Sequence, residues 1–383
     1  MPERIYLDWN ATTPLRPEAR QAMAAAWDIA GNPSSVHAEG RQARRLVEDA
    51  RAAVAATVGS RPQDVVFTSG GTEANALALT PGVRRGSGQP ARRLLVSAIE
   101  HTSVLSGGRF PPEAFGTIEV TALGLVDVDH LRALLAEGPP ALVSVMLANN
   151  ETGAIQPISQ VADVVHEAGG LLHVDAIQAL GKIPFEIKSM KADLITLSAH
   201  KIGGPKGVGA LVLGDDVQVE ALLRGGGQEL GRRAGTENVA GIAAFGAATS
   251  AGMAALAPHA PRLRSLRARL EKGLMQTPGM IVFSADAPRL PNTTLFTVPG
   301  LKAETAVIGF DLAGIAVSSG SACSSGKVQP SHVLAAMGVP KDLAQGAVRL
   351  SLGWSTSEAD IDLALQAWRK LADGLLRGRR NTA

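Results

Sequence analysis

A lysine near the middle of the chain has surroundings that suit covalent chemistry. Lys201 follows the apolar segment 194–197 and precedes the glycine-rich turn 203–207. A lysine at the end of a buried strand is partly desolvated, which lowers its pKa and lets the neutral amine form a Schiff base with an aldehyde. An ordinary exposed lysine in a turn explains the same pattern equally well, so this segment alone does not decide.

A carboxylate precedes this lysine at the end of another apolar segment. Asp175 follows residues 171–174 and lies 26 positions before Lys201. Carboxylates at strand ends of open α/β sheets face the ligand crevice. One placed there can keep a pyridine nitrogen protonated, as pyridoxal phosphate requires in order to act as an electron sink. A strand-end aspartate on its own is more often a helix cap.

The segment 68–75, Thr-Ser-Gly-Gly-Thr-Glu-Ala-Asn, joins an expected strand to a helix that begins near Thr72. Its two glycines let the backbone approach an anion, and the helix start offers free N–H groups. The segment therefore suits a phosphate cradle, although a plain helix start is an equal alternative. It matches neither a Walker A loop nor G-x-G-x-x-G, so ATP and dinucleotides are not indicated.

Two further side chains are candidates for proton transfer and nucleophilic attack. His101 follows the expected strand 94–97, where an imidazole could stack on a ring and move protons, although such a histidine is usually structural. Cys323, the single cysteine, lies among small polar residues at 318–326. That run predicts a mobile, exposed loop, which suits a nucleophile that must travel. An incidental surface cysteine is the alternative.

The composition excludes several classes of protein. The 383 residues include 37 Lys and Arg against 35 Asp and Glu, a net charge of +2, so nothing points to nucleic acid or an acidic membrane surface. One cysteine forms no intramolecular disulfide, and the eight histidines show no zinc spacing. The start of the chain shows no secretory signal, and we expect a cytoplasmic protein. The basic end at 377–380 is expected to be a solvated tail, and docking of a partner is the alternative.

Short apolar runs alternate with helical patterns over the first two thirds of the chain. This alternation predicts an α/β domain around a mostly parallel sheet. The expected helices are 40–58 and 159–168, and the expected strands are 64–68, 94–97, 141–148, 171–174, 194–197 and 208–213.

The pattern changes after about residue 258. The uncharged, Ala- and Gly-rich stretch 239–261 is expected to be one buried helix rather than a membrane span. We divide the chain into a large domain, 15–257, and a small α+β domain made of 1–14 and 258–383. The elements expected in the small domain are helices 262–275 and 357–376 and strands 293–298, 316–318 and 348–352.

The motifs as a set resemble the cysteine desulfurases, the NifS/IscS-like branch of the class V aminotransferase group. The resemblance runs nearly from end to end and implies the pyridoxal-phosphate-dependent transferase fold of type I. The segments that carry it are 6–14, 32–37, 68–75, 100–101, 149–153, 173–178, 198–202, 204–207, 225–229, 233–238, 318–326 and 348–353.

The resemblance implies a role for each matching residue toward pyridoxal 5'-phosphate. Lys201 would hold the cofactor covalently and move protons at the substrate's Cα and Cβ. Asp175 would pair with the pyridinium nitrogen, Gln178 with the phenolic oxygen, and His101 would stack on the ring and shuttle protons. The residues implied for the phosphate are Gly71, Thr72, Ser198 and His200, with Thr236 reaching over from the second subunit of a homodimer.

The resemblance also implies the substrate, L-cysteine, and the fate of its sulfur. Asn150 and Arg349 would grip the substrate carboxylate. Cys323 would attack the sulfur, which leaves alanine and a persulfide on Cys323. A sulfur-acceptor protein such as an iron–sulfur scaffold is the implied partner, and Cys323 would transiently ligate a shared cluster there.

Some residues depart from the family pattern, and some alternatives stay open. Leu230 stands where many relatives have arginine, Ala76 replaces a second asparagine, and Trp9 and Asn10 vary the first motif. A selenocysteine lyase or another class V β-eliminase or aminotransferase would share the same cofactor site. An inactive scaffold that kept the fold is a third reading, against which the intact Lys201 argues. The sequence does not choose the sulfur acceptor or its pathway.

Overall fold

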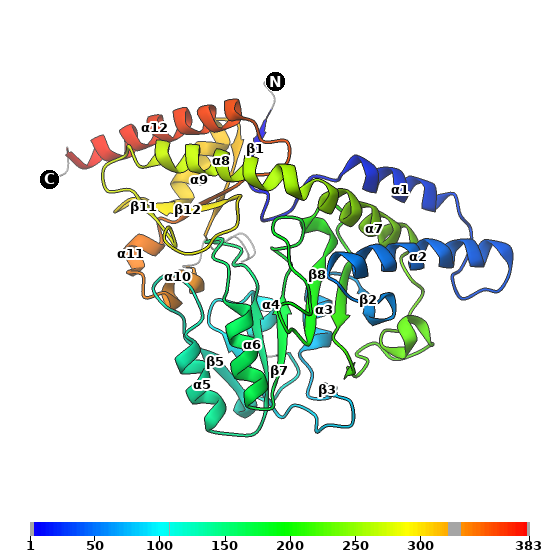
Figure 1. The fold of residues 1–383 in the computed structure, drawn as a ribbon. Coiled ribbons are helices and arrows are strands. Elements are labelled where there is room, and N and C mark those ends of the chain that lie inside the picture. Colours follow the sequence, from blue (N-terminus) through cyan, green and yellow to red (C-terminus); the bar gives the residue numbers. More distant parts are fainter. Residues whose placement is uncertain (1–3, 107, 321–330, 381–383) are drawn as a thin grey trace.

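The computed structural model describes residues 4–106, 108–320 and 331–380, with side chains as far as residue 374. Its largest element is a seven-stranded sheet in the order β2-β9-β8-β7-β6-β4-β5 (Figure 1). The five strands from β8 to β5 are parallel, and β9 is antiparallel to both of its neighbours. The mostly parallel α/β sheet is thus confirmed. The strands are β2 (Val65–Thr68), β4 (Arg93–Ser97), β5 (Phe115–Ile118), β6 (Ala141–Met146), β7 (Leu171–Asp175), β8 (Leu194–Ser198) and β9 (Gly209–Leu213).

Helices cover both faces of this sheet, so its inner strands are apolar without alternation. Most helices of the region belong to one face and its hydrophobic core: α1 (Pro17–Trp27), α2 (Ala38–Thr57), α5 (Val128–Ala136), α6 (Ile158–Glu167) and α7 (Val239–Ala254). The other face packs against α3 (Gly71–Ala78) and α4 (Thr102–Leu105). Side chains cap α2 and α5 at their starts, where His37 accepts from Gly40 N–H and Asp127 accepts from two backbone N–H groups.

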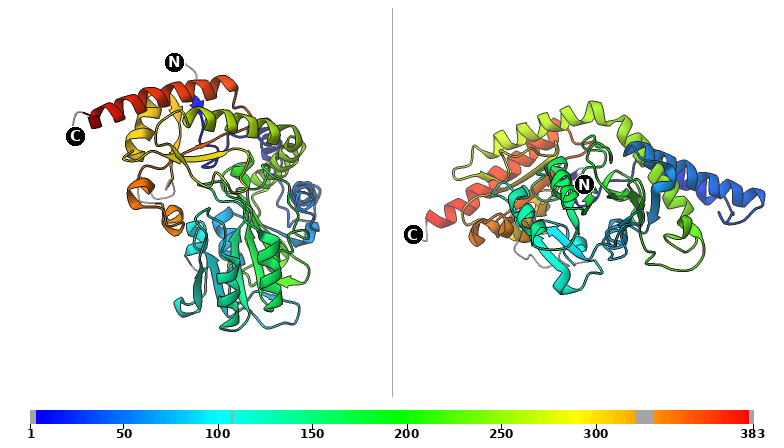
Figure 2. Two further views of the ribbon diagram at one scale, coloured as in Figure 1. Left: turned by 60° about the vertical axis from the view of Figure 1, so that its left-hand side comes forward. Right: turned by 60° about the horizontal axis from the view of Figure 1, so that its bottom comes forward.

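A second, four-stranded antiparallel sheet has its own hydrophobic core. The two long helices α8 and α12 lie side by side over it, at the opposite end of the molecule from α5 and α6 (Figure 2). The elements are β11 (Ile281–Val282), β12 (Thr293–Thr297), β14 (Ser318–Ser319), β15 (Val348–Ser351), α8 (Leu256–Leu274), α9 (Ala303–Leu312) and α12 (Glu358–Arg380). The shorter elements of the chain are β3 (Arg84–Arg85), which pairs with β10 (Val217–Gln218), α10 (His332–Ala336), α11 (Lys341–Ala344), and the 3-10 turns η1 (Pro62–Asp64), η2 (Pro112–Ala114), η3 (Ala199–Lys201) and η4 (Gln228–Gly231).

The N-terminal segment runs from the small sheet to the large one. Strand β1 (Ile5–Tyr6) pairs in parallel with β13 (Ile315–Ala316). Further along, Thr13 N–H donates to the carbonyl of His200 at 2.9 Å, and Arg16 N–H donates to that of Gly203 at 2.8 Å. Residues 7–16 therefore lie over the carboxyl end of β8, where the site residues predicted from the sequence gather.

The expected single helix 239–261 is wrong in one respect. The structure divides it into α7 and the start of α8, which meet at a bend of 69°. Both parts pack on other elements, so tertiary packing sets the bend. The predicted boundary at residue 257 lies beside it. Within the described residues no single helix is long and apolar enough to cross a membrane, although the bent pair meets the criterion by length and composition.

The small core depends on Trp368 of α12. Its ring is fully buried, lies 5.1 Å from the Phe296 ring centroid, and donates through Nε1 to Thr277 Oγ1 at 2.9 Å. Trp368→Ala therefore leaves a cavity and lowers the free energy of unfolding by about 3–5 kcal/mol, measured by urea unfolding. Leu363→Ala on the same helix, where the side chain is 50% exposed, is the control. Equal effects of the two changes would contradict the assignment of this core.

Candidate active site

A cavity of about 340 Å³ lies between the carboxyl ends of the central strands and the N-terminal segment. Parallel strands bring their carboxyl ends to one edge of a sheet, which explains why residues far apart in sequence meet there. Of the residues predicted from the sequence, those that line this cavity are Gly71, Thr72, His101, Asn150, Asp175, Gln178, Ser198, His200, Lys201 and Arg349.

Lys201 ends the short turn η3, directly after β8. Its Nζ donates to the backbone carbonyls of Asn10 at 2.6 Å and Ala11 at 2.7 Å. The N-terminal segment therefore holds the amine at the cavity wall. An amine fixed there, half-buried, is placed to bond covalently to an aldehyde in the cavity.

Asp175 presents a buried carboxylate at the end of β7. Oδ1 accepts from Ile177 N–H at 3.0 Å, and Oδ2 accepts from Asn75 Nδ2 at 3.0 Å. Burial raises the pKa of this carboxyl group, while its hydrogen bonds and the nearby His101 and Lys201 lower it. A buried carboxylate without an ion-pair partner among the described residues gains from a cationic ring nitrogen in the cavity. The carboxylate therefore fits a pyridinium ring.

The start of α3 forms one wall of the cavity. Gly70 precedes the helix, and no described side chain accepts from its first N–H groups. The first two residues of the helix, Gly71 and Thr72, line the cavity. A Cβ on Gly71 would lie 2.3 Å from Ile177 Cδ1, so only glycine fits this close approach. Free N–H groups and the helix dipole favour an anion. This wall therefore fits a phosphate group.

His200 lies near three lysines, whose charges make the local electrostatic potential positive. His200 Nδ1 lies 3.1 Å from Thr12 Oγ1. Burial, together with the charges of Lys201, Lys206 and Lys182, lowers the pKa of His200 to about 4. The ring is therefore neutral at pH 7, and a dianionic group bound here would relieve the repulsion among the lysines.

Gln178 lines the cavity, and the buried Lys182 follows it by four residues. Lys182 Nζ donates to Gln178 Oε1 at 2.6 Å and to Asn10 Oδ1 at 3.0 Å, and Gln178 Nε2 donates to the carbonyl of Asn10 at 2.9 Å. Burial and the charges of Lys201 and Arg349 lower the pKa of Lys182 well below its ordinary value. The site thus holds a second amine, one already engaged by two oxygens.

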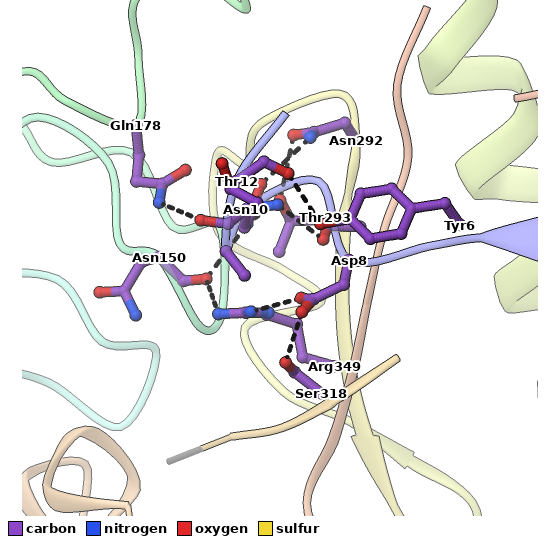
Figure 3. Close-up of polar contacts among 12 residues, drawn as sticks. Tyr6, Asp8, Asn10, Thr12, Asn150, Gln178, Asn292, Thr293, Ser318 and Arg349 are labelled. Atoms are coloured by element: carbon purple, nitrogen blue, oxygen red, sulfur yellow. Dashed lines mark hydrogen bonds and ion pairs between the residues drawn. The ribbon is translucent and has the colours of Figure 1, made fainter. Parts of the chain in front are cut away.

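Arg349 of β15 supplies the cationic side of the cavity (Figure 3). Its NH2 group donates to Asp8 Oδ1 at 2.7 Å and its NH1 group to the carbonyl of Asn150 at 3.1 Å, while Ser318 Oγ donates to Asp8 Oδ2 at 2.9 Å. The guanidinium is 2% exposed, and its Nε has no partner among the described residues. Its remaining N–H donors suit a carboxylate ligand.

His101 caps the short helix α4 and borders the same cavity. Its Nδ1 lies 2.8 Å from Ser103 Oγ and accepts from Ser103 N–H at 3.2 Å. Burial lowers the pKa of the imidazole, and the charges of Lys201 and His332 lower it further, against the opposing effect of Asp175. The arrangement favours a neutral ring.

One predicted residue, Thr236, lies away from this cavity, and another, Cys323, is not described by the structure. Thr236 lines a separate cavity of about 220 Å³, with Arg233 and Glu229. Cys323 lies outside the described residues. Its role stays a prediction, as do the roles assigned to the residues that line the main cavity.

The sequence reasoning missed Asp8, Asn10 and Lys182. The first two belong to the segment 6–14, which the sequence analysis recognised as a motif without giving it any chemistry. A charged or amide side chain within that otherwise apolar segment was the available signal. Lys182 had a weaker signal, a lysine four residues after Gln178.

Comparisons with known proteins found relatives that match nearly the whole chain. The family model for class-V aminotransferases matches residues 5–364. The chain is 43% identical to a cysteine desulfurase of Cereibacter sphaeroides, with 97% of each chain covered, and 42% identical to an IscS-like cysteine desulfurase of Mycobacterium tuberculosis, covering 98% of this chain and 97% of the relative. Among solved structures, a NifS-like protein from Rickettsia africae superposes with a TM-score of 0.89 at 37% identity, over 97% of this chain and all of the other.

A buried carboxyl group beside the site makes stability depend on pH. Glu151 accepts from Ser331 Oγ at 2.5 Å, and burial raises its pKa from 4.5 to about 7 although Ser331 and Arg349 oppose the shift. The folded chain therefore keeps a proton that the unfolded chain releases above pH 4.5. The stabilisation from Glu151 is present below that pH and is lost as the pH rises through about 7.

Glu151→Gln removes this dependence because the amide does not ionise. Relative to wild type, the variant should gain on the order of 3 kcal/mol of unfolding free energy between about pH 4 and about pH 8. Urea unfolding at a series of pH values measures the difference. The exposed Glu304→Gln is the control. Parallel pH profiles for wild type and Glu151→Gln would show that Glu151 keeps its ordinary pKa.

Proposed function

The chain belongs to the class-V aminotransferases and, among them, to the cysteine desulfurases, and we propose from this and the site that it removes sulfur from L-cysteine to give L-alanine. The observation that carries the proposal is the placement of Lys201, Asp175 and Arg349 around one cavity. An amine, a carboxylate and a guanidinium there match an aldehyde, a ring nitrogen and a substrate carboxylate.

The residues of the cavity fit pyridoxal 5'-phosphate. Lys201 would bond to its aldehyde, Asp175 would accept from the ring nitrogen, and Gln178 would contact the phenolic oxygen. When bound, the cofactor supplies an electron sink for charge that develops on the substrate's carbon atoms. The phosphate would lie at the start of α3, against Gly71, Thr72, Ser198 and His200.

The chain's own groups then orient the substrate and move its protons. Arg349 and Asn150 would hold the carboxylate of L-cysteine, which leaves its sulfur free to meet a nucleophile. Lys201 and His101 border the same cavity and would move protons at the substrate's Cα, Cβ and sulfur.

In the sulfur transfer, Cys323 would be the nucleophile. Its thiolate attacks the substrate sulfur, a sulfur–sulfur bond forms, and the bond between Cβ and sulfur breaks with its electron pair left on the carbon side. A proton then reaches Cβ, which yields alanine and a persulfide on Cys323. A thiol reductant or an acceptor thiolate removes the outer sulfur afterwards.

The proposal includes a homodimer, a sulfur-acceptor protein and a cytoplasmic location. A homodimer is supported by Thr236, which lies away from its own chain's cofactor cavity and could serve the other subunit. The persulfide would pass to a sulfur-acceptor protein such as an iron–sulfur scaffold, with Cys323 as a transient cluster ligand, in the cytoplasm.

Release of alanine and sulfide from L-cysteine under reducing conditions tests the proposal. We expect activity in the wild-type holoenzyme and a loss of at least about a thousandfold in Cys323→Ala, because the nucleophile is gone. Ser325→Ala, in the same segment, is the matched control. If Cys323→Ala still releases alanine, sulfur leaves without this cysteine, as expected of a selenocysteine lyase, whereas sulfide released with pyruvate and ammonia in place of alanine indicates a β-eliminase. If neither protein releases alanine, the proposal fails.

A further inference from the structure

A continuous set of hydrogen bonds connects Asp175 to His101 through the buried side chain of Asn75. Asn75 lies on α3 and is 0% exposed. Its Nδ2 donates to Asp175 Oδ2 at 3.0 Å and to Ser103 Oγ at 2.9 Å, and its Oδ1 accepts from Thr196 Oγ1 at 2.6 Å. Three of the four hydrogen-bonding positions of the amide are therefore used.

The carboxylate fixes the orientation of this amide. Asp175 accepts from Ile177 N–H at its other oxygen, and an ionised carboxylate can only accept. If the amide of Asn75 were turned over, its oxygen would face the carboxylate and two acceptors would meet in a buried place. The NH2 group of Asn75 therefore points at Asp175, and its oxygen points at Thr196.

The orientation of Asn75 then sets the proton of Ser103. Because Ser103 Oγ already accepts from Asn75, its own hydrogen is available for His101 Nδ1, which lies 2.8 Å away. Ser103 N–H donates to the same nitrogen at 3.2 Å. With two donors aimed at it, Nδ1 keeps its lone pair, and the proton of the neutral ring is placed on Nε2.

A second branch of hydrogen bonds begins at the oxygen of Asn75 and ends at the buried Ser144. Thr196 uses its hydrogen on Asn75, so it accepts from His173 Nε2 at 3.2 Å, and His173 Nδ1 accepts from Ser144 Oγ at 2.8 Å. Burial lowers the pKa of His173 to about 3, so this ring is neutral. The branch to Ser144 therefore offers a control that shares Asn75 but not His101.

We propose that Asn75 is a positioning residue that holds His101 as the Nε2–H tautomer. Asp175 orients the amide of Asn75, this amide orients the hydroxyl group of Ser103, and that hydroxyl group donates to His101 Nδ1; we call this sequence of hydrogen bonds the relay. No described residue bonds Nε2 of His101, so this N–H is left for the cavity that the ring lines. His101 then meets a bound molecule as a hydrogen-bond donor. The consequence for desulfuration rests on the proposed function, whereas the tautomer does not.

The groups that face the imidazole support a neutral ring. They are Asp175 on β7, Lys201 in η3 and His332 on α10. Burial, Lys201 and His332 lower the pKa of His101, and Asp175 alone raises it. A cation would also place a hydrogen on Nδ1, against Ser103 N–H.

Nitrogen-15 NMR of the full-length holoenzyme, labelled at histidine and free of substrate, tests the tautomer. The two imidazole nitrogens have distinct shifts with and without a proton, and His101→Gln assigns the signals. We expect the Nε2–H form in wild type. A wild-type spectrum dominated by Nδ1–H would overturn the proposal without any variant.

Asn75→Asp replaces the group that donates to Ser103 with one that accepts from it, at nearly constant side-chain volume. Its oxygen in place of the NH2 group can only accept from Ser103, even when a proton on that carboxyl group is directed at Asp175. The Ser103 hydroxyl then turns away from His101, and the ratio of Nδ1–H to Nε2–H forms should rise roughly fivefold, the effect of one hydrogen bond.

Ser144→Ala is the control for this experiment, because it breaks only the branch to His173. Its His101 signals should match those of wild type. An unchanged ratio in a folded Asn75→Asp protein would contradict the relay. Since no substrate is present, failure to release alanine would refute the proposed function and leave this result standing.

Discussion

The site depends on one buried asparagine in the N-terminal segment. Asn10 bonds to the small sheet through its backbone N–H, which donates to Ser351 Oγ at 2.9 Å, and through Nδ2, which donates to Thr293 Oγ1 at 2.9 Å. Its carbonyl accepts from Lys201 and Gln178, which follow strands of the large sheet. A single residue thereby joins the two sheets (Figure 3). It also holds the amine of Lys201 at the cavity wall. Each of these buried groups would be costly to leave unpaired, so the network has one low-energy arrangement.

The charges around this junction are arranged to accept a ligand. Burial raises the pKa of Glu100 well above its ordinary value and lowers that of Lys182 well below, so both residues favour the neutral form. Arg349 is paired with Asp8 but keeps N–H donors, and Asp175 has no ion-pair partner among the described residues. The cavity is thus lined by a carboxylate, a guanidinium and the uncapped start of α3, whose N–H groups favour an anion. A ring with a cationic nitrogen and a phosphate complements that distribution.

The sequence analysis predicted those site residues that follow the ends of β-strands. Asp175 and Lys201 end neighbouring apolar runs, and parallel pairing of β7 with β8 brings those ends to the same edge of the sheet. The contact between Asp8 and Arg349 joins residues 341 positions apart, and no local period signals it. Asn10 lies in an irregular segment, and its contacts are set by tertiary packing. The bend after α7 has the same origin, since an apolar helical stretch does not show where its neighbours will turn it.

In the proposed function, Lys201 rather than the nearby Lys182 is the amine that takes the cofactor. Each amine donates to two oxygens, but Lys182 is buried and does not line the cavity, whereas Lys201 is half-buried and lies at the cavity wall. Borohydride reduction of the holoenzyme, followed by peptide mass mapping, fixes the cofactor on its lysine and identifies that lysine. We expect a pyridoxyl group on the peptide that contains Lys201. Finding it on Lys182, or on neither lysine in a protein that binds the cofactor, would show that Lys201 does not hold the cofactor.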